Sequence, residues 1–310
     1  MKAVTYHYVR PDTLGLPHFR YLHIDDFRQQ LDRFVANDDL VEREVFFRAL
    51  ESGAAPPRGC VLTFDDGFKD HFEFVLPALE ARGLWGIFYV PTGMYASGEL
   101  LDVHRIHLLL GSRGGKAIAE ALDRVLDDQM LSDKHREQFR SRTYRSQSND
   151  EYTLSVKRCL NYFVAYEYRK RVLDVLMDEF FGNARQLVDD FYMNQEELTA
   201  IQRAGMILGS HTVTHPVMSQ LSVREQETEI SESFAFLARV TGGLTVRTFC
   251  YPYGGFHTFT EATEQILSDA GCKFSFNVEA RDITNADLQT RPQALPRYDC
   301  NIFPNGACRG

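Results

Sequence analysis

Residues 60–67 read Cys-Val-Leu-Thr-Phe-Asp-Asp-Gly, an apolar run that ends on two adjacent carboxylates. The run CVLTF (60–64) has the composition of a buried strand, and it follows the turn-forming residues GAAPPRG (53–59). Successive side chains of a strand point to opposite faces, so Asp65 and Asp66 at its end can be aimed at different targets. Two interpretations are open: a site in which one carboxylate binds a metal, or a helix N-cap with a second carboxylate near the helix dipole.

Similar apolar runs alternate with helical patterns along the chain. Runs typical of strands are 3–9, 85–91, 206–210, 248–252 and 273–278, and amphipathic segments typical of helices are 24–38, 71–83, 195–205, 223–243 and 259–271. Repeated βα units predict a parallel sheet, either open or closed into a barrel. In both architectures, ligands bind at the carboxyl ends of the strands.

The alternation stops between about Met94 and Phe191. This part contains charged segments with helical periodicity, such as 114–130 and 154–182. It is too long for an ordinary βα connection. We therefore expect a barrel domain formed by 1–93 and 192–310, and a helical insertion over 94–191 that either caps the barrel mouth or adds only structural padding.

The composition restricts the classes of partner. A net charge of −9 and a pI near 5.6 argue against an electrostatically driven nucleic-acid partner. Residues 1–12 lack the apolar stretch of a signal peptide, and no run of 18 apolar residues follows, so we expect a cytoplasmic protein without a membrane span. The six cysteines are scattered without CxxC spacing, which favours free thiols over a cysteine-type zinc site or disulfides.

A second strand end carries paired histidines. The stretch GSHTVTHP (209–216) places His211 and His215 four residues apart, and Pro216 disfavours helical geometry at His215, which predicts a turn. Neutral imidazoles are good ligands for zinc and similar divalent ions. Two histidines and one aspartate would form an open site with room for water, which is the pattern of a catalytic metal centre.

A third strand end is rich in turn residues. In FCYPYGGF (249–256), Pro252, Tyr253 and Gly254 follow an apolar run. Backbone N–H groups in such a turn can donate to an oxyanion, although the same residues also form ordinary turns.

The motifs TFDDG, SHTVTHP and FCYPYG, in this order and each at a strand end, resemble the first three motifs of the polysaccharide deacetylases, the NodB-homology or carbohydrate esterase family four group. The resemblance extends to YHYV (6–9) and LPRY (295–298), and it leaves 94–191 unmatched. It implies a distorted (β/α) barrel with about seven strands, and a hydrolase that removes an N-acetyl group from an amino sugar, a glycan or a glycan precursor.

The resemblance also implies roles for individual residues. Asp66, His211 and His215 would bind a divalent metal ion, with zinc as the first candidate, and Asp65 would be the general base. A bound ion of this kind can lower the pKa of its water from 15.7 to about 7. The backbone N–H of Tyr253, in the turn with Pro252 and Gly254, would stabilise the oxyanion.

The chain departs from the better-known members of this family at two points. Where they carry an arginine in the third motif, this chain has Cys250, and no histidine follows His257 to act as a late general acid. We expect Arg297 to pair with Asp65, and His7 to protonate the leaving amine; both substitutions resemble the branch with FAYPYG-like third motifs. A surface ion pair and a hydrogen-bonded core histidine are the alternatives.

Two other functions remain open. Some relatives with this barrel hydrolyse a non-sugar amide, such as a formamide or an allantoin-like compound. A metal-free glycan-binding protein is the non-enzymatic alternative, and the complete set of potential ligands argues against it.

Overall fold

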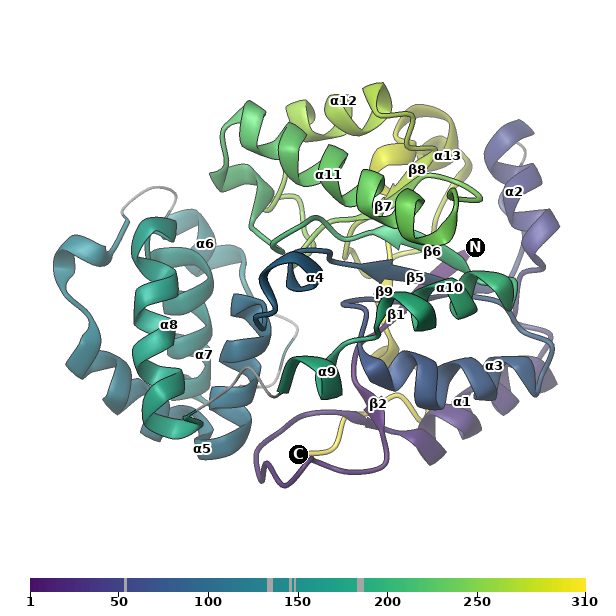
Figure 1. Ribbon diagram of the computed structural model, residues 1–310. Coiled ribbons are helices and arrows are strands. Elements are labelled where there is room, and N and C mark those ends of the chain that lie inside the picture. Colours follow the sequence, from purple (N-terminus) through teal and green to yellow (C-terminus); the bar gives the residue numbers. More distant parts are fainter. Residues whose placement is uncertain (53–54, 133–135, 145–146, 148, 183–186) are drawn as a thin grey trace. The chain divides into compact units, whose positions relative to one another are not determined.

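The computed structural model describes residues 1–52, 55–132, 136–144, 147, 149–182 and 187–310 (Figure 1). These residues form two compact units. The barrel unit comprises Met1–Pro11, Tyr21–Ala96 and Asp189–Arg309, and the helical unit comprises Asp12–Arg20, Ser97–Val188 and Gly310.

The barrel unit is built around one sheet of seven strands, in the order β8-β7-β6-β5-β4-β1-β9. Every neighbouring pair in this sheet is parallel. The strands are β1 (Lys2–Tyr6), β4 (Cys60–Phe64), β5 (Ile87–Val90), β6 (Ile207–Ser210), β7 (Thr248–Cys250), β8 (Phe274–Phe276) and β9 (Tyr298–Asp299). This curled parallel sheet confirms the expected distorted (β/α) barrel.

Helices connect and cover these strands (Figure 1). They are α1 (Ile24–Ala36), α2 (Arg43–Ser52), α3 (Leu76–Glu80), α10 (Gln195–Arg203), α11 (Val223–Thr241), α12 (Glu261–Asp269) and α13 (Asn285–Thr290), with the short α4 (Met94–Ser97) and α9 (Val188–Phe191) where the chain passes between the units. Capping boxes at Asn194, Ser222 and Thr260 satisfy backbone N–H groups where α10, α11 and α12 begin.

Two elements differ from the sequence expectation in their limits. The run expected as one strand over 3–9 divides after Tyr6, and Val9–Arg10 forms β2, which pairs with β3 (Leu22–His23) in a separate two-stranded sheet. The helix expected over 71–83 begins with a π-helical turn, His71–Val75, before α3. In both places the apolar periodicity predicts one continuous element, and the backbone instead changes its geometry within it.

The C-terminal segment joins the two edges of the sheet. Leu295 bridges to Phe276 at the end of β8, and Tyr298 pairs with Val4 of β1. Arg297 lies between these two attachments, and its carbonyl accepts a hydrogen bond from the N–H of Glu279 at 3.2 Å. The backbone at Arg297 is therefore held from both sides of the barrel.

Alternation along β4 assigns its side chains to two faces. Phe64 packs against Phe88 and Tyr6, with ring centroids 4.7 and 5.2 Å away, and against Phe27 of the covering helix α1. Thr63 points to the opposite face, where its hydroxyl contacts Arg297. The strand that carries the two carboxylates is thus anchored by aromatic packing on its helix-covered face.

The helical unit consists mainly of α5 (Asp102–Val125), α6 (Arg136–Arg142), α7 (Glu151–Arg158) and α8 (Tyr166–Phe180). A left-handed residue, Gly114, with φ of 73°, kinks α5. Arg105 contacts both Asp102 and Asp174, which ties α5 to α8. The capping role of the insertion stays a prediction.

Among the described residues, no helix combines the length and apolar character that a membrane span requires. All six cysteines are free thiols, and four of them (Cys60, Cys250, Cys272 and Cys300) are buried.

Truncation of Phe64 tests the anchoring of β4. We expect Phe64→Ala to lower the free energy of unfolding by about 3–5 kcal/mol, because the substitution removes a fully buried ring and leaves a cavity. Urea denaturation measures the change. Val35→Ala on the exposed face of α1 is the control, and we expect its effect to lie within about 0.5 kcal/mol. Equal effects of the two substitutions would contradict this account.

Candidate metal and catalytic site

Three buried donor groups meet at the carboxyl ends of β4 and β6. They belong to Asp66, His211 and His215, and one ligand atom from each lies within 4.8 Å of the others. The Oδ1 atom of Asp66 lies 3.6 Å from Nε2 of His211 and 3.4 Å from Nε2 of His215. The structure therefore brings together the three residues that the sequence analysis proposed as metal ligands.

A left-handed turn aims the two carboxylates differently. The N–H of Asp65 still donates to the carbonyl of Tyr6 at 2.9 Å, so Asp65 continues the register of β4. Asp66 has a φ of 80° and Gly67 a φ of 65°, so the chain turns out of the strand there. The sequence analysis expected strand alternation alone to point the two carboxylates in different directions. The turn at Asp66 also contributes to this difference.

The two histidines lie on a turn, as the sequence predicted. Thr212 and His215 both have positive φ, 69° and 59°, which is uncommon outside glycine. The N–H of His215 donates to the hydroxyl of Thr212 at 2.9 Å, which closes the turn. The N–H of His211 donates to Val90 at the end of β5, at 3.1 Å.

The protonation state of His211 suits a metal ligand. Its Nδ1 lies 2.7 Å from the carbonyl oxygen of Cys250, and because that oxygen only accepts, Nδ1 carries the proton. Burial lowers the pKa of His211, which favours the neutral ring. The lone pair of Nε2 then faces the Asp66 carboxylate. Two acceptors at this distance repel each other unless a cation lies between them, so the donor set fits a divalent ion.

Asp65 is paired with Arg297 rather than with the histidines. Nη1 and Nη2 of Arg297 donate to Oδ1 and Oδ2 of Asp65 at 2.8 and 2.7 Å, and both side chains are almost fully buried. The hydroxyl of Thr5 donates to Oδ2 at 3.2 Å. Burial alone would raise the pKa of Asp65, but the charge and hydrogen bonds of Arg297 hold that pKa well below its usual range. The burial of Arg297 excludes the surface ion pair.

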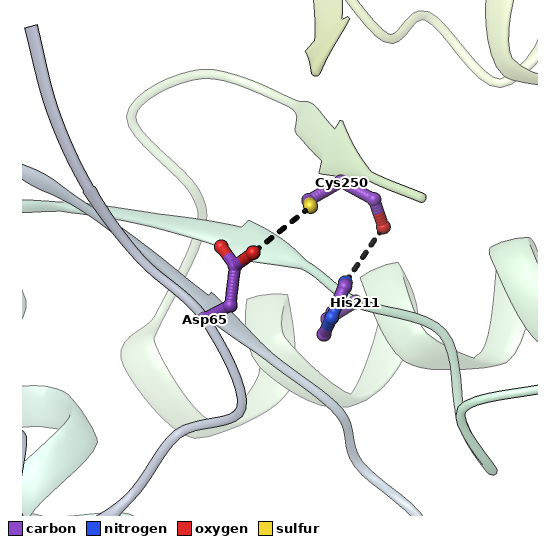
Figure 2. A group of neighbouring side chains, drawn as sticks. All are labelled: Asp65, His211 and Cys250. Carbon is purple, nitrogen blue, oxygen red and sulfur yellow. Dashed lines mark hydrogen bonds between the residues drawn. The ribbon is translucent and has the colours of Figure 1, made fainter. Parts of the chain in front are cut away.

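Cys250 completes the surroundings of Asp65 (Figure 2). Its thiol lies 3.5 Å from Oδ2 of Asp65, and Nη2 of Arg297 lies 2.8 Å from its sulfur. Asp65, His211 and Cys250 also satisfy the spacing of a metal site. The guanidinium already supplies positive charge there, and burial raises the pKa of the Cys250 thiol well above its usual value. This second group therefore does not suit a cation.

His7 lies beside the carboxylate pair with access to solvent. Its Nε2 is 4.0 Å from Oδ2 of Asp65, and its side chain is 44% exposed. Nε2 of His71 donates to the carbonyl of His7 at 2.9 Å, which fixes the backbone there. The exposure of His7 excludes the alternative of a core histidine.

The third motif forms a tight turn next to the histidines. Tyr253, Gly254 and Gly255 all have positive φ, and the Tyr253 ring lies 4.9 Å from the His215 ring. The N–H of Gly254 donates to the carbonyl of Tyr251 at 3.2 Å, and Pro252 has no N–H. Neither Pro252 nor Gly254 therefore offers a spare backbone N–H, and the oxyanion role of the Tyr253 N–H stays a prediction.

Sequence reasoning missed two polar side chains around the site. The hydroxyl of Thr5 touches Asp65, and the carboxylate of Glu229 accepts hydrogen bonds from the turn between the two histidines. Thr5 lies on β1, which pairs with β4, so strand pairing was a usable signal. Glu229 lies inside an amphipathic helix, and nothing in the sequence distinguishes it from other surface glutamates.

The chain was compared with protein-family models, curated proteins and solved structures. Residues 167–275 match the family model described as polysaccharide deacetylase; this range includes both histidines and Tyr253 but neither Asp65 nor Asp66. No curated protein matches the chain.

Several solved structures share the fold. They include the Streptococcus pyogenes deacetylase PplD in complex with acetate (17% identity, TM-score 0.57, covering 96% of this chain and 91% of that chain). IcaB from Ammonifex degensii (18% identity, TM-score 0.53, covering 96% and 90%) and a de-N-acetylase from Aggregatibacter actinomycetemcomitans (13% identity, TM-score 0.52, covering 96% and 93%) are also similar. At these identities the likeness shows the fold.

Removal of the Arg297 charge tests the electrostatics of the site. We expect Arg297→Ala to lower the free energy of unfolding at pH 7 by about 3–5 kcal/mol, because Asp65 is left buried without its partner. Burial then raises the pKa of Asp65 in the variant, whereas in the parent that pKa is depressed. The folded variant therefore takes up a proton as the pH falls, so the deficit shrinks from pH 7 toward pH 4.

Urea denaturation across this pH range measures the effect. Arg291→Ala is a matched control, since Arg291 makes a two-pronged contact with Glu264 at the exposed surface. We expect it to cost about 0–1 kcal/mol. A deficit for Arg297→Ala that is small, or that does not change with pH, would contradict the assignment.

Proposed function

We propose that this chain, whose residues 167–275 match the polysaccharide deacetylase family model, is a metal-dependent hydrolase that removes the acetyl group from an N-acetylated amino sugar, glycan or glycan precursor. The observation that carries the proposal is the separate engagement of two adjacent carboxylates, Asp66 with two histidines and Asp65 with Arg297. A ligand and a proton acceptor side by side are what hydrolysis of an amide by an activated water needs.

Asp66, His211 and His215 would hold the ion, and zinc suits their two imidazoles and one carboxylate. When bound, a divalent ion lowers the pKa of its water to about 7 and polarises the carbonyl of the substrate. The hydrogen bond from His211 to the Cys250 carbonyl fixes the orientation of that ring before an ion arrives.

Asp65 acts as the general base in this proposal. Arg297 keeps the carboxylate ionised, so it is ready to take the proton of the attacking water at neutral and mildly acidic pH. The same contact makes Asp65 a weaker base, because a lower pKa reduces the driving force for proton transfer. Arg297 therefore gives the Asp65 carboxylate a fixed orientation and a constant charge, and it lowers the strength of Asp65 as a base.

The remaining steps fall to two groups at the rim. The N–H of Tyr253 would donate to the oxygen that becomes negative when water adds to the acetyl carbon. The C–N bond then breaks, His7 donates a proton to the leaving nitrogen, and acetate and a free amine are the products. The partial exposure of His7 leaves it able to exchange that proton with solvent.

Two further assignments remain proposals. The presence of Cys250 and the use of Arg297 support the family branch with FAYPYG-like third motifs. A cytoplasmic location is supported by the six free cysteines, since thiols persist in a reducing compartment.

Acetate release from N-acetylated amino sugars and oligosaccharides tests the activity. We expect release to stop after chelation and to return when zinc is restored, because chelation removes the ion that Asp66, His211 and His215 would hold. A formamide and an allantoin-like compound belong in the same assay, with formate and ureide products measured. Full activity after chelation would rule out the metal-dependent mechanism, and turnover of the non-sugar amides alone would favour the other substrate class.

Two substitutions distinguish the role of the general base from the role of the metal ligands. We expect Asp65→Asn to slow turnover by about 10²–10⁴-fold, since it removes the proton acceptor, while bound metal stays at the parent level. His215→Ala should lose both metal and activity. Turnover is measured by acetate release, and metal content by elemental analysis of the dialysed proteins. An Asp65→Asn variant as fast as the parent would remove Asp65 from the mechanism.

A further inference from the structure

The turn between His211 and His215 has an unfavourable backbone conformation. Thr212 and His215 both have positive φ, and Thr212 is β-branched, which makes this conformation especially uncommon. Such residues persist only when their surroundings hold them. The contacts of this turn therefore decide whether the two imidazoles keep their positions.

One side of the turn is held by the segment that follows β5. The N–H of Thr92 donates to the carbonyl of Thr212 at 3.1 Å, and the N–H of Gly93 donates to the carbonyl of Val213 at 2.7 Å. A Cβ atom at Gly93 would lie 2.7 Å from that carbonyl oxygen, so only glycine allows this approach. These contacts satisfy the carbonyl groups of Thr212 and Val213.

The N–H groups on the other side are held by one side chain of α11. Oε2 of Glu229 accepts from the N–H groups of Val213 and Thr214 at 2.7 and 2.9 Å, and Oε1 accepts from the hydroxyl of Thr214 at 2.6 Å. One helical turn later, the hydroxyl of Ser233 is hydrogen-bonded to that of Ser210, the residue before His211. Residues four apart lie on the same face of a helix, so α11 is hydrogen-bonded both to the turn and to the end of β6 that precedes it.

We propose that Glu229 is a positioning residue for the metal site, which acts by fixing the backbone of residues 212–214 so that both imidazoles face Asp66. This inference rests on the proposed function, because it concerns the same ligands. Glu229 is hydrogen-bonded to Val213 and Thr214, which lie between the two histidines in the sequence. Its effect is therefore on the geometry of the site and on its affinity for metal.

A glutamine at this position preserves the geometry. Its amide oxygen can accept from both backbone N–H groups, as Oε2 does, and its amide nitrogen can donate to the Thr214 hydroxyl. An alanine preserves none of the three bonds. Glu227, exposed on the same helix, provides a matched control for the loss of one negative charge.

The test is the dissociation constant for zinc, measured by competition with a chromophoric chelator on the full-length parent and variants. We expect Glu229→Ala to weaken zinc binding by about 10–100-fold, the range found when groups that orient metal ligands are removed. Glu229→Gln should bind zinc nearly as tightly as the parent, and Glu227→Ala as tightly. Equal zinc affinity in the parent and in a folded Glu229→Ala variant would overturn the inference.

Hydrogen exchange of the metal-free proteins gives a second readout. We expect the amides of Val213 and Thr214 to exchange faster in Glu229→Ala than in the parent, and at the parent rate in Glu227→Ala. If Glu229→Ala does not fold, Thr214→Val removes only the hydroxyl bond and should show a smaller change in the same direction. Unchanged exchange and unchanged zinc affinity in Thr214→Val would then contradict the proposal.

The two measurements separate this inference from the proposed function. If the parent binds no zinc or other divalent ion, the metal-dependent function fails, and the exchange rates alone decide the role of Glu229. If the parent binds zinc and Glu229→Ala binds it equally well, only the positioning role fails.

Discussion

The burial of two adjacent carboxylates is the constraint on which the site depends. An uncompensated buried charge is strongly destabilising, so each carboxylate needs a positive partner of its own. Asp65 finds it in the guanidinium of Arg297, and Asp66 faces two imidazoles whose geometry suits a shared cation. The chain turns out of the strand at Asp66, which has a φ of 80°, and the two carboxylates meet different partners.

The same ion pair links the site to the closure of the barrel. Asp65 and Arg297 are 232 residues apart in the sequence, and Arg297 lies on the segment that bridges β8 and pairs with β1. The guanidinium reaches Asp65 only when that segment is in place. Correct closure and a correctly charged site therefore arise together, so a chain with an unclosed sheet would leave Asp65 buried without its partner.

The sequence predicted those parts of the site that depend on local spacing. The strand before Asp65, the turn forced by Pro216 and the proximity of His211 and His215 all follow from short-range patterns. The contact between Arg297 and Asp65 was expected from the resemblance, because the better-known polysaccharide deacetylases carry an arginine where this chain has Cys250. Backbone angles and helix-to-turn contacts are different: the φ of Asp66 and the bonds made by Glu229 arise from tertiary packing, which no local pattern encodes.

Cys250 explains how the positive charge beside Asp65 can come from Arg297 on the C-terminal segment. Its small, neutral thiol lies beside the Asp65–Arg297 pair, 3.5 Å from Oδ2 of Asp65 and 2.8 Å from Nη2 of Arg297, and leaves room for the guanidinium. An arginine at position 250 would bring a second buried guanidinium to the same carboxylate, and like charges in a region of low dielectric repel strongly. Positions 250 and 297 therefore act as a pair: an arginine added at position 250 would leave the site with too much positive charge, and loss of Arg297 would leave it with too little.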